Sequence, residues 1–179
     1  RAVRKPLDLD LPELGISLGD DGRVSHVAPR ARLDAHKLVE EFMIAANVAA
    51  AETLEKKRSP CMYRIHEEPA GDKVSALREF LETLEFKLSK GQALKPHHFN
   101  SILAKVRDTP QEQLVNTVVL RSQSQAVYSP DNVGHFGLAL KRYAHFTSPI
   151  RRYADLLVHR GLISSLDLGD DGLADDAGE

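Results

Sequence analysis

The stretch from Tyr143 to Arg160, YAHFTSPIRRYADLLVHR, holds the residue types best suited to chemistry. Its Ser148–Pro149 pair predicts the start of a helix, because serine caps free N–H groups and proline fits the first turn. Arg151 and Arg152 would then lie at the positive end of the helix dipole. Two cations are unfavourable there unless an anion joins them, so the pattern indicates an anion site.

Two interpretations of these arginines are open. In the first, both guanidinium groups and the helix N–H groups form a pocket for a phosphate. In the second, Arg151 pairs with Asp155, four residues further on, across a solvated helix face. The spacing alone does not separate the two.

A second candidate segment is GHFGLAL, in which Gly134 and Gly137 flank His135 and Phe136. Glycine lets the backbone approach a ligand closely. Phe136 could stack on a base, and His135 could contact a phosphate. From the residues alone, a tight turn that leads into a buried strand is the favoured interpretation.

Asn47 lies within the apolar stretch MIAANVAAA. A buried amide needs a hydrogen-bond partner, so Asn47 either bonds a neighbouring loop or lines a site. Glu41 is more typical of a solvated helix face. His97 and His98 would point in different directions on a helix, and no third ligand is suitably spaced, so we expect no metal site there.

Helices with short strands between them are predicted to position these residues, which is an α+β pattern. Leu38 and Val39 begin two neighbouring apolar stripes on a long helix, so we expect that helix to be buried along a wide face. The expected helices span residues 31–58, 73–86, 95–108, 109–125 and 148–166, and the expected strands span a pair within 15–29, then 61–66, 126–129 and 135–140.

Composition restricts the class of protein. The chain has 179 residues, of which 42% are hydrophobic, and its only cysteine is Cys61. No apolar run approaches the roughly 20 residues of a membrane span, and a reducing, cytoplasmic setting is expected. The net charge is −2, but residues 167–179 form an acidic tail, expected to be disordered, with six acids and no base. The remainder, with 24 basic and 20 acidic residues, is mildly basic and permits an anionic partner.

Several stretches together resemble the catalytic RNB domain of the ribonuclease II / ribonuclease R family, and the likeness to bacterial ribonuclease R is closer. They are LDLDLPE, AHKLVEEFMIAANVAAA, YRIHEEP, LRSQSQAVYSP, GHFGLAL and YAHFTSPIRRYADLLVHR. The resemblance covers most of residues 1–165. It implies that residues 1–166 are the later part of a catalytic domain. It also implies a processive 3′→5′ exoribonuclease that uses Mg²⁺ to hydrolyse single-stranded RNA to nucleoside 5′-monophosphates.

The same resemblance implies roles for individual residues. Arg151 matches the arginine at the scissile phosphate, with Ser148 and Arg152 beside it as RNA-binding or supporting residues. Tyr63 resembles the family's base-stacking aromatic residue. Residues 134–136 would lie near the terminal nucleotides, and Asn47 and Glu41 would help to shape the cavity.

One departure from the family pattern limits these implications. The aspartates that bind Mg²⁺ in the family would precede Arg1, so we expect no metal ligands within this chain. The flanking RNA-binding domains are not in it either. We therefore expect a fragment that is inactive alone and that works with the rest of the catalytic domain on an RNA 3′ end. A non-catalytic RNA-binding module and a helical scaffold are the alternatives.

Overall fold

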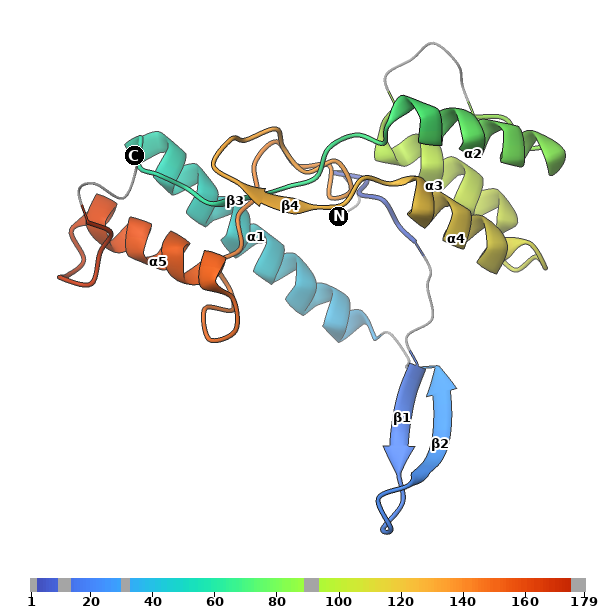
Figure 1. The fold of residues 1–179 in the computed structure, drawn as a ribbon, viewed down its shortest axis with the longest axis horizontal. Helices are drawn as coiled ribbons and strands as arrows, with labels where there is room; N and C mark the ends of the chain where they lie inside the picture. Colours follow the sequence, from blue (N-terminus) through green and yellow to red (C-terminus); the bar gives the residue numbers. More distant parts are fainter. Residues whose placement is uncertain (1–2, 10–13, 30–32, 89–93, 175–179) are drawn as a thin grey trace.

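The computed structural model describes residues 3–9, 14–29, 33–88 and 94–174, and these contain five helices joined by short strands (Figure 1). No helix in these ranges is long and apolar enough to cross a membrane. The helix-rich α+β expectation is confirmed. The elements are β1 (Leu14–Leu18), β2 (Val24–Pro29), α1 (Asp34–Lys57), β3 (Tyr63–Ile65), α2 (Gly71–Thr83), α3 (Pro96–Val106), α4 (Glu112–Ser122), β4 (Val127–Ser129) and α5 (Tyr153–Leu166).

Helix α1 is buried along only part of its length. Its carboxyl-terminal half packs against α5 and buries a narrow stripe of residues, Ile44, Asn47, Ala50, Ala51 and Leu54. In its amino-terminal half, Leu38, Val39, Phe42 and Met43 are exposed, and Phe42 is 66% exposed. The expected wide buried face is therefore wrong for this half of the helix, because α5 covers only the other half.

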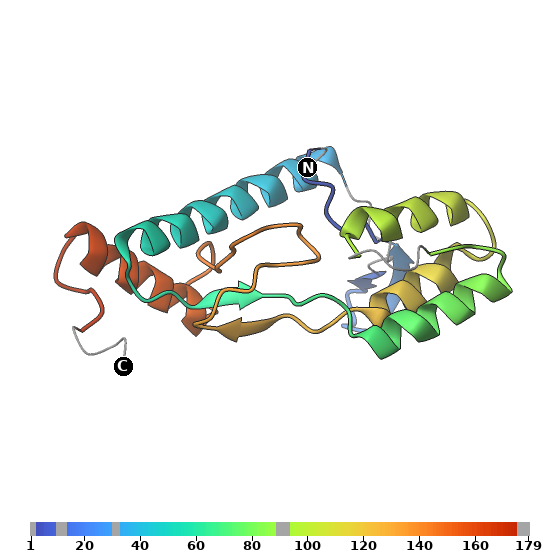
Figure 2. The ribbon, with the colours of Figure 1, turned by 90° about the horizontal axis from the view of Figure 1, so that it is seen from above.

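Strands β3 and β4 pair antiparallel in the middle of the molecule (Figure 2). Their register places Tyr63 opposite Ser129 and Arg64 opposite Tyr128. Successive side chains on a strand point to opposite faces, so Tyr63 and Tyr128 belong to different faces of this ladder. The expected strand at 135–140 is instead a turn, which is closed by hydrogen bonds between His135 and Leu140.

Two apolar cores stabilise the two ends of the molecule. One joins α1 and α5 to β3 and contains Ala51, Leu54, Ile65, Ala144 and Val158. The other lies among α2, α3 and α4 and includes Phe99 and Phe136, whose rings meet edge to face with centroids 6.1 Å apart. Phe136 therefore ties the loop after β4 to the three-helix unit.

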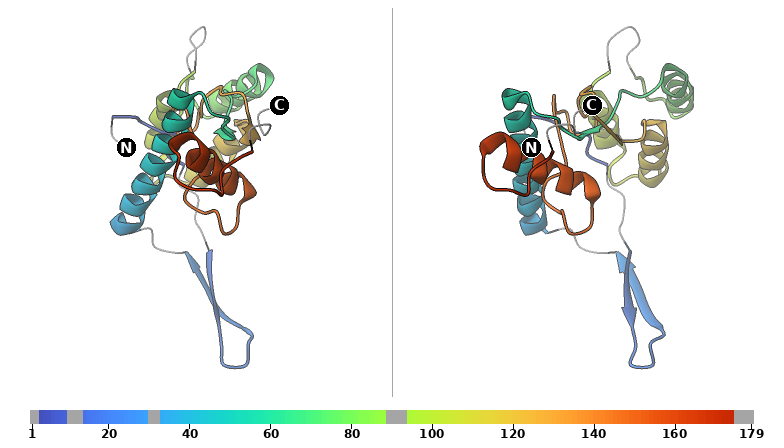
Figure 3. Two further views of the ribbon diagram at one scale, coloured as in Figure 1. Left: turned by 90° about the vertical axis from the view of Figure 1, so that its left-hand side faces the viewer. Right: turned by 60° about the vertical axis from the view of Figure 1, so that its left-hand side comes forward.

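The β1–β2 hairpin projects from the rest of the chain (Figures 1 and 3). Its register places Ile16 opposite Val27 and Leu18 opposite Val24, so the apolar side chains share one face. These side chains remain exposed, as does Leu14. An exposed, wholly apolar ribbon face of this kind is typical of a surface that another segment covers.

Residues 167–174 lie against α5 and do not form the disordered tail that the sequence suggested. Arg160 donates to the carbonyl of Gly172 at 2.9 Å, and the Ser164 hydroxyl donates to that of Leu173 at 3.0 Å. These hydrogen bonds hold the segment in spite of its acidic composition. The remaining part of the expected tail, 175–179, lies outside the described residues.

Truncation of Phe99 tests the core of the three-helix unit. Phe99 has no solvent exposure, so Phe99→Ala should lower the free energy of unfolding by about 3–5 kcal/mol. The measurement is urea denaturation followed by circular dichroism. The matched control is Phe42→Ala, which should change stability by less than about 0.5 kcal/mol because that ring is already exposed. Equal losses in the two variants would contradict the described packing.

Candidate functional site

Arg151 and Arg152 precede the first helical residue of α5 and do not lie within its first turn. Residues 149–151 form a turn in which the Arg151 N–H donates to the Ser148 carbonyl at 3.3 Å. Arg152 is the extended N-cap residue, and the helix begins at Tyr153. The predicted start at Ser148–Pro149 is therefore wrong. The acid of the first turn is Asp155, which suits the positive end of the helix dipole.

Asp155 organises this turn. Its side chain has no solvent exposure. Its Oδ1 accepts the Ser148 backbone N–H at 2.7 Å and an Arg152 Nη2–H at 2.8 Å, and its Oδ2 accepts the Arg152 Nε–H at 2.7 Å. Burial raises the pKa of Asp155, but the bonds from Arg152 and Ser148 outweigh burial, and the pKa lies below its ordinary value.

Asn47 of α1 holds the approach to the same turn. Its side chain is 3% exposed. Its Oδ1 accepts the backbone N–H groups of Phe146 and Thr147 at 2.9 and 3.2 Å, and its Nδ2 donates to the Tyr143 hydroxyl at 2.9 Å. Of the two interpretations of Asn47, the bond to a neighbouring loop is the one that the structure shows.

Arg151 lies on the exposed outer part of this turn. Within the described ranges, its side chain makes no ion pair or hydrogen bond, because Asp155 pairs with Arg152. The ion-pair interpretation of Arg151 is therefore wrong. A guanidinium presents several donors in a fixed plane, so Arg151 can bind an oxyanion at two points.

The Gly134–Phe136 segment is a tight turn against β3. The Gly134 backbone has a φ of +83°, and a Cβ there would lie 2.9 Å from the Leu140 oxygen, so the turn requires glycine. Phe136 is only 9% exposed and belongs to the core of the three-helix unit. Its ring is not open to a base, which corrects the stacking role considered from the sequence.

Histidine and tyrosine rings form a row between this turn and the Arg151 turn. His135 meets Tyr143 at a centroid distance of 5.3 Å, and Tyr143 meets His145 at 5.6 Å. Burial, reinforced by neighbouring cations, lowers the pKa of both His135 and His145 to about 4. The cations beside His145 include Arg152 and Arg151, so the row of rings ends near Arg151. Both imidazoles are therefore neutral at neutral pH.

The accessible tyrosine of the β3–β4 ladder is Tyr128, and it is not Tyr63. Tyr63 is 8% exposed and packs in the core of α1 and α5, so its ring is closed to a base in this structure. Tyr128 is 40% exposed, its hydroxyl lies 2.8 Å from His145 Nδ1, and the Arg64 guanidinium lies 4.8 Å from its ring centre. Tyr128 pairs with Arg64, the residue after Tyr63, so the two tyrosine rings lie on opposite faces of the ladder and the ring of Tyr128 is the one that faces the site.

Glu41 lies outside this cluster. Its carboxylate accepts two hydrogen bonds from Arg4, at 2.9 and 3.0 Å, and so fastens the amino-terminal segment to α1. The structure thus brings together Arg151, Arg152, Ser148 and Asn47. His135 is linked to them only through the rings of Tyr143 and His145, and Glu41 lies in a structural ion pair.

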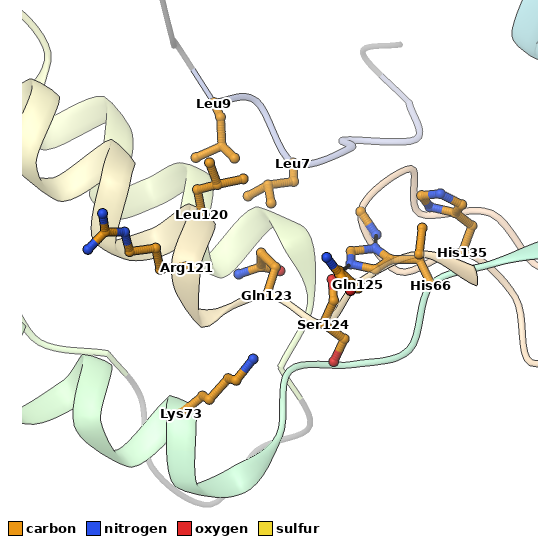
Figure 4. Close-up of a pocket in the computed structure, with 12 residues that line it drawn as sticks. Leu7, Leu9, His66, Lys73, Leu120, Arg121, Gln123, Ser124, Gln125 and His135 are labelled. Atoms are coloured by element: carbon orange, nitrogen blue, oxygen red, sulfur yellow. Dashed lines mark hydrogen bonds between the residues drawn. The ribbon is translucent and has the colours of Figure 1, made fainter.

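A cavity of about 630 Å³ lies on the other side of His135, between the three-helix unit and the β3 strand (Figure 4). Lys73 of α2 and Arg121 of α4 are among its lining residues, none of which carries a carboxylate. Apolar side chains, amides and two cations together suit a nucleotide or another anion with an apolar part. The lining residues are Leu7, Leu9, His66, Lys73, Leu120, Arg121, Gln123, Ser124, Gln125, Ala126, His135 and Gly137.

Sequence reasoning missed Asp155 as an organiser and missed His145 and Tyr128 altogether. For Asp155 a signal existed, because an acid three residues after Arg152 can pair with it as readily as with Arg151. His145 and Tyr128 meet only through the fold, since they lie in separate loops and strands. Among the described residues, no group of three or more His, Cys, Asp or Glu side chains could hold a metal ion.

Comparison with known proteins adds the family. Residues 1–167 match the RNB domain. The chain is 43% identical to ribonuclease R of Vibrio cholerae over 162 residues, which are 90% of this chain and 20% of that protein. It is 46% identical to ribonuclease R of Aquifex aeolicus over 160 residues, 89% of this chain and 23% of that one. It therefore spans about a fifth of the length of these relatives.

A solved structure gives the same answer for the fold. Mycoplasma genitalium RNase R, in complex with ribose-methylated single-stranded RNA, superposes with a TM-score of 0.83 at 28% identity. The match covers 95% of this chain and 28% of that one.

The neutral histidines predict a pH dependence of stability. Their pKa values are about 4 in the folded chain and about 6.5 when unfolded, so the unfolded chain binds more protons between these values. The contribution of the two neutral histidines to the free energy of unfolding is therefore complete above about pH 6.5 and is lost as the pH falls toward 4. The difference in melting temperature between pH 7.5 and pH 5 should be smaller for the His135→Gln/His145→Gln double variant than for the wild-type chain. The exposed His26 is the control, and His26→Gln should leave the wild-type pH dependence unchanged.

Proposed function

Because the chain belongs to the RNB domain family, we propose that it is the part of a processive 3′→5′ exoribonuclease that holds the scissile phosphate of single-stranded RNA. The products are nucleoside 5′-monophosphates. The observation that carries the proposal is Arg151, an exposed guanidinium that makes no ion pair or hydrogen bond among the described residues. Asp155 of α5 holds the turn that bears it, and Asn47 of α1 holds the segment before that turn. The complex of the Mycoplasma relative with single-stranded RNA supports RNA as the ligand.

Arg151 is suited to stabilise charge that develops on the phosphate. Its donors are fixed in a plane, and a preorganised donor aimed at a developing oxyanion stabilises a transition state more than a ground state. The paired Arg152 supports the turn through Asp155. His145 is neutral at neutral pH, so it adds hydrogen-bonding capacity near Arg151 without a further positive charge.

Mg²⁺ does not fit the described residues of this chain, since they contain no suitable group of ligands. We place the Mg²⁺ ligands of the complete enzyme in other segments of the catalytic domain. The exposed apolar faces of the β1–β2 hairpin and of the amino-terminal half of α1 are suited to pack against those segments.

The alternative of a plain scaffold predicted ion-paired arginines, and among the described residues Arg152 is paired with Asp155 whereas Arg151 makes no ion pair. The alternative of a non-catalytic RNA-binding module would use the same phosphate contact, so it differs from the enzyme in chemistry rather than in binding.

The isolated chain should bind RNA weakly and release no mononucleotides. The described residues contain no group of ligands suited to a metal ion, and an arginine cannot replace the carboxylates of a metal site. The measurement is incubation of the chain with labelled single-stranded RNA and Mg²⁺, followed by separation of the products on a gel. Adding the remainder of the parent enzyme as a separate polypeptide should restore cleavage. Mononucleotide release by the chain alone, above a metal-free control, would contradict the expectation.

In the complete enzyme, Arg151→Ala and Arg151→Lys should both lower the single-turnover rate constant by roughly 100- to 1,000-fold. Lysine keeps the charge but loses the planar two-point donor. Metal-free RNA affinity should fall much less, because other phosphate and stacking contacts remain.

The control for Arg151 must be an exposed arginine without a structural role. Arg107, at the end of α3, meets this requirement, and Arg107→Ala should cleave at the wild-type rate. Arg152 is unsuitable because it neutralises the buried Asp155. If Arg151→Lys cleaves normally, or if rate and affinity fall in parallel, Arg151 does not act on the scissile phosphate.

A further inference from the structure

We propose that Asp155 is a positioning residue, which sets the placement of Arg151 through the Ser148–Arg152 turn without touching RNA itself. The inference rests on the proposed function of Arg151 and adds the device that aims its guanidinium. It is carried by one juxtaposition, in which a solvent-free carboxylate binds both ends of the turn that bears Arg151.

The geometry of the turn makes this control direct. Asp155 Oδ1 takes the backbone N–H of Ser148, where the turn begins, and both carboxylate oxygens take the guanidinium of Arg152, where it ends. Between these two points the chain has one internal hydrogen bond, from Arg151 N–H to Ser148 O at 3.3 Å. The direction in which the Arg151 side chain leaves the turn therefore depends on where Asp155 holds Ser148 and Arg152.

The pairing also settles which arginine is available to an anion. Arg152 donates two hydrogen bonds to Asp155, and its side chain is largely covered, whereas Arg151 is exposed. The nearby His145 is neutral at neutral pH. Within the part of the chain that the structure describes, the turn thus presents Arg151 as its unpaired cation to an approaching phosphate.

Asn47 fastens the preceding segment but not the turn itself. It bonds the N–H groups of Phe146 and Thr147, and His159 of α5 lies 2.8 Å from the Phe146 carbonyl. These contacts place the approach to the turn between α1 and α5. They leave Asp155 as the described side chain that contacts the turn on both sides of Arg151.

The test uses the complete enzyme and the variant Asp155→Asn. Asparagine has nearly the same shape and keeps an oxygen for the Ser148 N–H, but it loses the charge that holds Arg152. We expect the single-turnover rate constant at saturating enzyme to fall by about 10- to 100-fold, as for a displaced catalytic group. We expect metal-free RNA affinity to stay level or rise, because the positive charge of Arg152 is then no longer paired with a carboxylate and can attract phosphate.

A double variant separates positioning from general damage. If Asp155 acts through Arg151, then Asp155→Asn should slow cleavage no further in an Arg151→Ala background. The control for lost stability is Leu77→Ala, which truncates a buried side chain of α2 in the core of the three-helix unit, away from the turn. It should lower the melting temperature and leave the rate constant unchanged. If Asp155→Asn does not fold, Arg152→Lys replaces it, because lysine keeps the charge and loses the two-point bond.

Each failure has a distinct reading. If Arg151→Ala slows cleavage while Asp155→Asn or its replacement does not, the positioning role is wrong and the proposed function stands. If the two substitutions slow cleavage independently, so that their effects multiply, Asp155 does not act through Arg151 and the inference is overturned. If Arg151→Ala itself cleaves at the wild-type rate, the proposed function and the inference both fail.

Discussion

A carboxylate without solvent contact needs donors on its oxygens, and the way Asp155 obtains them shapes the candidate site. Arg152 supplies two donors and the Ser148 backbone supplies the third. Removing one partner from such a buried, hydrogen-bonded pair is costly, since a charge would be left without compensation. The turn therefore has one strongly favoured arrangement, and in that arrangement Arg151 is the arginine that remains exposed.

The helix pair α1–α5 makes this arrangement possible. The stripe on α1 that packs against α5 contains Asn47, so the same contact that buries Leu54 and Val158 brings an amide to the loop before the turn. The stripe of α1 that packs against α5 therefore also supplies the side chain that bonds the loop. Neutral histidines complete the environment, because burial and nearby cations both disfavour their charged forms.

The sequence predicted the order of helices and strands well, because apolar periodicity and proline positions act locally. It misplaced the start of α5. The Ser148–Pro149 pair is typical of a helix start, but the Ser148 N–H is bonded to the Asp155 side chain, and the helix begins only at Tyr153. The family resemblance also pointed to Tyr63 as the base-stacking ring, whereas Tyr128 is the more exposed tyrosine of the ladder. Which ring of a short ladder is buried depends on the core that covers one face, and no local pattern in YRI or VYS records that.

The two cores are separated along the molecule, and the candidate site lies between them. Phe136 anchors one side of the His135 turn in the three-helix unit. In the α1–α5 unit, Asp155 anchors the Arg151 turn and Asn47 anchors the segment before it. The distance from His135 to Arg151 is therefore set by how the two units are held together across β3 and β4. The exposed apolar faces of the hairpin and α1 lie outside both cores, so further catalytic-domain segments packing there would add contacts without rearranging either anchor. In the proposed function, the turn that bears Arg151 is therefore built locally by α1 and α5, and the metal chemistry is assigned to other segments of the catalytic domain.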